Sequence, residues 1–87
     1  MKKIILGILL SCVIFIQNVY AEPVDINSAD AKTIAENLKG VGLKKATRIV
    51  EFRLENGPFR TIDDITKVKG IGPKILEQNK SYIVLTN

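Results

Sequence analysis

Residues 38–46 and 68–76 repeat one another, and this repeat constrains the fold more than any other feature of the chain. Each segment reads apolar, Lys, Gly, apolar, Gly, any residue, Lys. Matched segments at such a spacing indicate a repeated supersecondary unit. The flanks of both segments have helical periodicity, so each Gly-x-Gly is predicted to join two helices. Neither hairpin alone would bury enough apolar surface, which favours two hairpins on one shared core.

The first unit is predicted to contain two helices. The first of these is expected to start at a cap on Asn27 or Ser28 and to run to about Leu38, where Lys-Gly follows. The second is expected over residues 43–56, because Gly57 provides a typical stop for a helix C-terminus.

The second unit is predicted to repeat this arrangement. Residues 61–64 have the character of a capping box and are expected to start a short helix that reaches Val68. After the turn at residues 70–72, Pro73 occupies the first helical position, where proline is tolerated best. This last helix is expected to end near Lys80.

The predicted fold class is all-α: a compact, SAM-domain-like tandem of about four or five short helices. An apolar tail at residues 82–85 either packs against these helices or offers a surface to a partner, and the sequence leaves its form open. The core that joins the two units is expected to contain Phe52, Phe59, Ile62, Ile65, Val68, Ile71 and Ile75.

Residues 1–21 have the three-part layout of a secretory signal peptide. Two lysines precede an apolar run at residues 4–16, and modest side chains lead to Ala21. The apolar run is short for a bilayer span, which needs about 20 residues. We expect cleavage after Ala21 and release of one domain, residues 22–87, into the periplasm or another extracytoplasmic space, without stable membrane insertion.

Two alternatives would keep the chain at a membrane. In the first, the signal segment stays uncleaved and serves as an anchor. In the second, the segment ending in Leu9-Leu10-Ser11-Cys12 acts as a lipoprotein cleavage box, which would leave a lipidated Cys12 at the N-terminus. Residues 13–16 argue against lipidation, because they remain apolar where a polar tether would be expected.

The composition excludes several chemistries. The chain has 1 Cys and 0 His, and the cysteine falls in the predicted signal. Disulfides, thiol catalysis and zinc sites with Cys or His ligands are therefore excluded for residues 22–87. The adjacent acidic pair Asp63-Asp64 is explained by its place at a helix start. The Gly-x-Gly turns lack the third glycine of a dinucleotide fingerprint. We therefore predict no catalytic site, metal site or cofactor.

The positions of the charges are more informative than their total. The whole chain carries 13 Lys+Arg and 9 Asp+Glu, and two of the lysines lie in the predicted signal, so the domain is only mildly basic. Cations crowd the first half of the helix predicted at residues 43–56, whereas Glu51 and Glu55 lie near its end. This order opposes the helix dipole. A local cost without a local benefit is typical of a functional site.

Positive charge gathers at both Gly-x-Gly turns. Glycine lets a ligand approach the backbone closely, and unpaired N–H groups at a helix start favour an anion. One such turn alone would be interpreted as a tight connection with solvated lysines, whereas two matched turns predict a phosphate clamp. The predicted phosphate-binding residues are Gly40, Val41, Gly42, Lys44, Lys45, Arg48, Gly70, Ile71, Gly72 and Lys74, with Lys39, Lys67 and Lys69 as a secondary basic group.

The ordered string of residues resembles tandem helix-hairpin-helix DNA-binding domains, and its wider pattern resembles the ComEA-like competence proteins. Asp25-Ile26-Asn27-Ser28-Ala29 is similar to the opening motif of that family. The resemblance covers about residues 24–84, although Leu76 stands where a small residue is usual. Further matching positions are Ala46, Ile49, Phe52, Arg53, Gly57, Phe59, Asp64, Ile65, Gly70, Ile71 and Gly72.

This resemblance implies an exported protein that holds double-stranded DNA without sequence preference during DNA uptake in transformation. Turn amides would contact phosphates, lysines would neutralise them, and binding would weaken steeply with salt. One module should bind weakly, so retention would need many copies along one duplex. The DNA-uptake machinery is a further expected partner. The alternative is a protein-binding adaptor of the cell envelope that uses the apolar tail.

Overall fold

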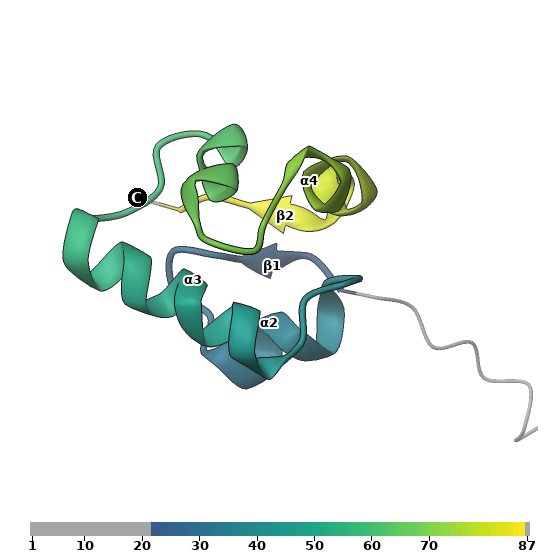
Figure 1. Cartoon of the computed structure of the whole chain (residues 1–87), viewed down its shortest axis with the longest axis horizontal. Helices are drawn as coiled ribbons and strands as arrows, with labels where there is room; N and C mark the ends of the chain where they lie inside the picture. Colours follow the sequence, from purple (N-terminus) through teal and green to yellow (C-terminus); the bar gives the residue numbers. More distant parts are fainter. Residues whose placement is uncertain (1–21, 87) are drawn as a thin grey trace, which may run out of the picture.

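The computed structural model describes residues 22–86, so the predicted signal peptide lies outside the described residues. The first hairpin consists of α2 (Ala31–Asn37) and α3 (Leu43–Asn56), and the second of the 3₁₀-helix η1 (Ile62–Lys67) and α4 (Pro73–Asn79). Two short strands, β1 (Val24–Asp25) and β2 (Ile83–Val84), run between the hairpins (Figure 1). The all-α class is confirmed, with this small sheet as an addition.

Helix α2 begins later than the sequence predicted. Its cap is Asp30, whose carboxylate accepts the amide of Thr33 at 2.8 Å. The predicted caps Asn27 and Ser28 are wrong, because both lie in a preceding turn held by Asp25. The Asn27 amide donates to the Asp25 carboxylate at 3.0 Å, and the Ser28 hydroxyl donates to it at 2.7 Å.

Helix α3 has the predicted bounds. Its N-cap is Gly42, and Gly57 ends it in the left-handed region at φ 88°. Ala46 and Ile49 turn inward and are fully buried, whereas Leu54 is 77% exposed. Helix α3 therefore has a buried face and an exposed face, as is typical of a surface helix.

The second hairpin confirms the predicted start signals. Thr61 and Asp64 form a capping box, in which the Thr61 amide donates to the Asp64 carboxylate at 3.3 Å. The helix that follows, η1, is a 3₁₀-helix. Pro73 occupies the start of α4 as predicted. The α-helix ends at Asn79, and the 3₁₀-helix η2 (Lys80–Tyr82) continues the chain to β2.

The apolar tail is part of the fold. Strand β2 pairs in parallel with β1, so that Val24 lies opposite Ile83 and Asp25 opposite Val84. The side chains of Val24 and Ile83 are buried, and Thr86 binds the carboxylate of Asp25 just beyond the strand. The pairing therefore joins the two ends of residues 22–86 across the interface between the hairpins.

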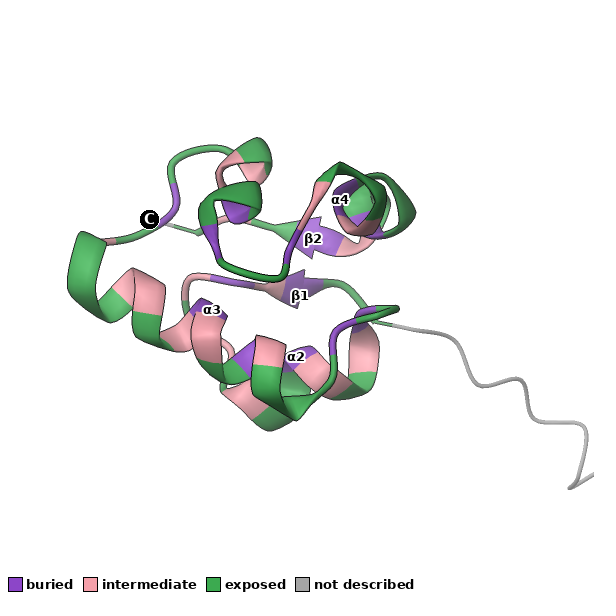
Figure 2. Ribbon diagram, in the orientation of Figure 1, coloured by how far each residue is buried: buried purple, intermediate pink, exposed green. Residues whose placement is uncertain are grey.

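One core serves both hairpins (Figure 2). Of the predicted core residues, Phe59, Ile65, Val68 and Ile71 are buried, whereas Phe52, Ile62 and Ile75 are only partly buried and pack against its edge. None of the helices within residues 22–86 is long and apolar enough to cross a membrane. The core also contains Val24, Ile26, Ile34, Leu38, Val41, Ala46, Ile49, Leu76 and Ile83.

Candidate functional site

The two hairpin turns share one backbone design, in which the first glycine has a structural role. Gly40 and Gly70 have φ values of 73° and 94°. Residues other than glycine rarely adopt this left-handed region of backbone conformation. The first glycine of each turn is therefore required by the backbone that reverses the chain between two helices.

The second glycine of each turn has no such requirement. Gly42 and Gly72 have ordinary φ values of −79° and −102° and stand at the N-caps of α3 and α4. An added Cβ at either position would meet nothing within 4 Å. Neither glycine provides a side-chain cap for its helix, so the start of each helix stays open to an approaching ligand.

Backbone amides at the start of α3 point away from the helix without an internal partner. The first intrahelical bond runs from the Ala46 amide to the Gly42 carbonyl at 2.9 Å. The amides of Leu43, Lys44 and Lys45 precede it and so have no partner inside the helix. Such amides, together with the positive end of the helix dipole, form a site suited to an anion.

The start of α4 offers fewer amides. Its first intrahelical bond runs from Leu76 to the Gly72 carbonyl at 3.1 Å, and Pro73 has no N–H. The amide of Ile71, which the sequence placed in the site, donates to the Val68 carbonyl at 3.0 Å. The Ile71 side chain is buried, so this residue anchors the turn to the core. Val41 is buried in the same way in the first turn.

Each turn packs against a helix of the other hairpin. A Cβ built on Gly70 would lie 3.2 Å from the Arg48 guanidinium and 3.4 Å from the Lys45 side chain, both on α3. A Cβ on Gly40 would lie 3.6 Å from Ile75 on α4. The turn of each hairpin is thus held by contacts with a helix of the other hairpin, and not only by its own helices.

Because of this packing, two of the predicted cations lie at the turn of the other hairpin. Arg48 donates to the Lys69 carbonyl at 3.4 Å, so Lys45 and Arg48, although they belong to the first repeat, lie at the second turn. Lys44 and Lys74, which follow the two N-cap glycines, are exposed. The structure therefore places Lys45, Arg48 and Lys69 together at the second turn.

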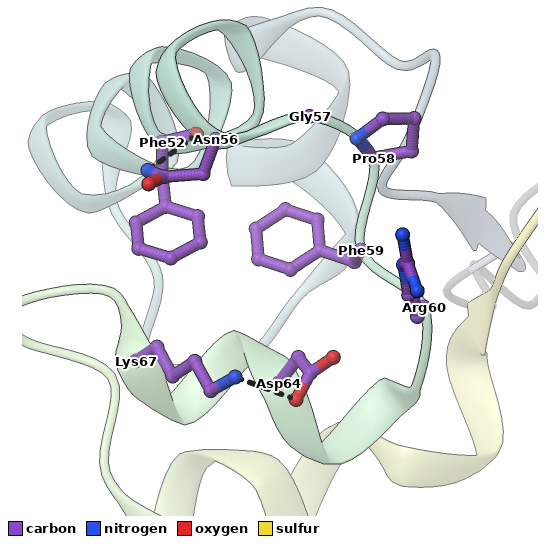
Figure 3. A pocket seen from close by; sticks show the side chains of 8 residues that line it. All are labelled: Phe52, Asn56, Gly57, Pro58, Phe59, Arg60, Asp64 and Lys67. Carbon is purple, nitrogen blue, oxygen red and sulfur yellow. Dashed lines mark hydrogen bonds and ion pairs between the residues drawn. The ribbon is translucent and has the colours of Figure 1, made fainter.

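Lys67 lies apart from this group. Its ammonium nitrogen is 3.3 Å from the Asp64 carboxylate, at a hollow of about 250 Å³ beside the C-terminal end of α3 (Figure 3). The rings of Phe52 and Phe59 stack there with centroids 5.3 Å apart. Lys67 is therefore a member of a local ion pair on η1. No cluster of residues that could hold a metal ion occurs within residues 22–86.

Sequence reasoning did not single out Asn79 as a site residue. Its side chain is fully buried and binds the backbone of Lys39, next to the first turn. The available signal was the repeat itself, because the two Gly-x-Gly turns align Asn79 with Ile49, an apolar residue of the core.

Two hairpins, each closed by a Gly-x-Gly turn and joined through one core, define a tandem helix-hairpin-helix domain. The helix-hairpin-helix motif family matches residues 19–84, so the chain belongs to this family. It is 48% identical over 62 residues to ComE operon protein 1 of Bacillus subtilis, which confirms the predicted ComEA-like resemblance. This match covers 71% of the chain and 30% of that protein.

Two other relatives extend the comparison. A Haemophilus influenzae protein described as uncharacterized is 38% identical over 66 residues, which cover 76% of this chain and 59% of the relative. Human S1 RNA-binding domain-containing protein 1 is 37% identical over 60 residues, which cover 69% of this chain and 6% of the relative. The chain thus spans less than two thirds of each of these relatives.

Proposed function

We propose that this protein binds double-stranded DNA without sequence preference, through phosphate contacts at its two turns. The observation that carries the proposal is the pair of N-cap glycines, Gly42 and Gly72. The backbone does not require glycine at either position, and neither position has a side-chain cap. A phosphate oxygen is the kind of acceptor that would use the amides left open by these two residues.

The chemistry of the site favours phosphate over base recognition. Backbone amides and lysines bind phosphate oxygens, which carry no sequence information. The exposed Lys44 and Lys74 would neutralise phosphates at the two turns, with Lys45 and Arg48 beside Gly70. Because such binding releases condensed counterions, its affinity should fall steeply as salt rises.

Similarity to ComE operon protein 1 supports a role in DNA uptake during competence. In this proposal residues 1–21 direct export, cleavage follows Ala21, and the domain acts outside the cytoplasm on incoming DNA. Many weakly bound copies along one duplex would block backward sliding and so bias its movement inward. The DNA-uptake machinery is the expected protein partner, and the role is binding rather than catalysis.

The alternative adaptor role depended on an exposed apolar tail. In residues 22–86 the tail is paired with β1, and Ile83 is buried in the core. Among residues 82–85 only Val84 is exposed, so the tail belongs mainly to the fold, and DNA binding remains the function that the site supports best.

The test is binding of the purified protein to two unrelated duplexes across a salt series. A Lys44, Lys45, Lys74 triple alanine variant should lose affinity, and its slope of log K against log salt should fall by about 0.9 for each lost phosphate contact. The matched control replaces Lys32, Arg60 and Lys80, which are exposed cations outside residues 38–46 and 68–76, and so removes the same charge.

The control separates local contacts from total charge. We expect it to retain most of the affinity and the slope of the wild-type protein. Equal losses in both triple variants would show that only the overall charge matters and would overturn the assignment to the turns. Absence of wild-type binding at low salt, or a strong preference for one duplex, would overturn the proposed function itself.

A further inference from the structure

Asn79 is a buried amide at an apolar position of the repeat. Its side chain is 0% exposed, and it is the one polar residue among the buried side chains of residues 22–86. The corresponding residue of the first hairpin is Ile49, which is equally buried. Burial of a polar amide is unfavourable unless hydrogen bonds compensate for the lost water. An apolar side chain could fill the core at this position and would need no hydrogen bonds there.

All the hydrogen bonds of the Asn79 side chain go to backbone groups. Its Oδ1 accepts the Lys39 amide at 2.7 Å, and its Nδ2 donates to the Lys39 carbonyl at 2.9 Å. The same Nδ2 donates to the Ile75 carbonyl of α4 at 2.9 Å. One side chain of the second hairpin thus binds both the backbone amide and the backbone carbonyl of Lys39, the residue that immediately precedes Gly40.

The two turns are held in different ways. Lys69 is the counterpart of Lys39. Its carbonyl accepts one bond from the Arg48 guanidinium at 3.4 Å, and the Arg48 side chain is only partly buried. The backbone of Lys39 makes two shorter bonds with the fully buried Asn79 side chain, one as donor through its amide and one as acceptor through its carbonyl. The first turn therefore depends on Asn79 for its placement, whereas the second lies against the cationic side chains of α3.

We propose that Asn79 is a positioning residue for DNA binding. It fixes the backbone at Lys39, so that the open amides after Gly42 face the same duplex as the second turn. Asn79 itself does not touch the ligand. This role rests on the proposed function, and it explains why the core contains an amide where the repeat pattern calls for an aliphatic side chain.

The experiment compares Asn79→Leu with the wild-type protein and with Ile26→Val, a core substitution at a residue that is likewise 0% exposed. Leucine fills a similar space but cannot bind Lys39. We expect Asn79→Leu to stay folded and to bind duplex DNA roughly threefold to tenfold more weakly, with a salt slope lower by about 0.9. Ile26→Val should lower the melting temperature and leave the salt slope unchanged.

The salt slope distinguishes positioning from a purely structural role. If Asn79→Leu changes the melting temperature but binds with the wild-type slope, Asn79 supports only the fold and the inference is overturned. If the wild-type protein itself fails to bind DNA, the proposed function falls first and this role falls with it. Should the leucine variant not fold, Asn79→Ala removes the same bonds with less bulk, and the same slope comparison decides.

Discussion

Glycines in the two turns illustrate how far single residues can be interpreted from sequence. The Gly-x-Gly pattern predicted both turns, and the nearby lysines predicted an anion site. The pattern could not show that the first glycine sets the backbone while the second leaves the surface open, because φ values of 73° for Gly40 and −79° for Gly42 appear only in the fold. The placement of Lys45 and Arg48 at the second turn also depends on packing between the hairpins.

Asp25 provides a prediction at the residue scale. Its carboxylate accepts hydrogen bonds from the Thr86 hydroxyl, the Ser28 hydroxyl and the Asn27 amide, which together lower its pKa from 3.8 to about 2. A lowered pKa stabilises the fold above the ordinary value of 3.8, and this contribution is lost as pH falls towards 2. Asp25→Asn should therefore cost about 1 kcal/mol near neutral pH, after allowance for solvent screening.

Denaturant unfolding at neutral pH and again near the lowered pKa of Asp25 checks this prediction. The gap between wild type and Asp25→Asn should close as pH falls, because wild-type Asp25 also becomes protonated. Glu36→Gln, at an exposed position on α2, is the control for a general loss of negative charge. A stability gap that stays constant across this pH range would refute the assigned ionisation.

At the scale of elements, periodic and capped segments were predictable and short ones were not. Helix α3 was placed correctly because its apolar spacing and the glycine at its end agree. The start of α2 was misplaced because Asn27, Ser28 and Asp30 are all good caps, and only the fold shows that Asp25 binds the first two. Strands β1 and β2 have two residues each, too few to leave a periodic pattern.

The packing of β2 can be tested with a pair of neighbouring residues. Ile83 is 5% exposed and Val84 is 42% exposed, although they are adjacent on one strand. Ile83→Ala should reduce the free energy of unfolding by about 2–4 kcal/mol, because it leaves a cavity in the core. Val84→Ala should change it by less than about 0.5 kcal/mol. Similar losses from both substitutions, measured by denaturant unfolding, would argue against the tail as part of the core.

At the scale of the whole molecule, the repeat predicted two units on one core. It did not predict that the turn of each hairpin packs against a helix of the other hairpin. Residue alignment alone cannot show that Gly40 lies beside Ile75 while Gly70 lies beside Lys45. These contacts between the hairpins fix the two turns relative to each other. The pairing of β1 with β2 is a further link between the two ends of the domain. In the proposed DNA complex, we therefore expect the two turns to act as a unit.

The most direct test of this account is the DNA affinity of Gly42→Ser, Gly72→Ser and the double variant, measured with their thermal stability. Serine suits the observed backbone, and its hydroxyl caps the helix by accepting the open amides. We predict stability equal to or slightly above wild type, with DNA binding weakened in each single variant and nearly lost in the double variant. Unchanged binding by the folded double variant would contradict the claim that the two helix starts bind phosphate.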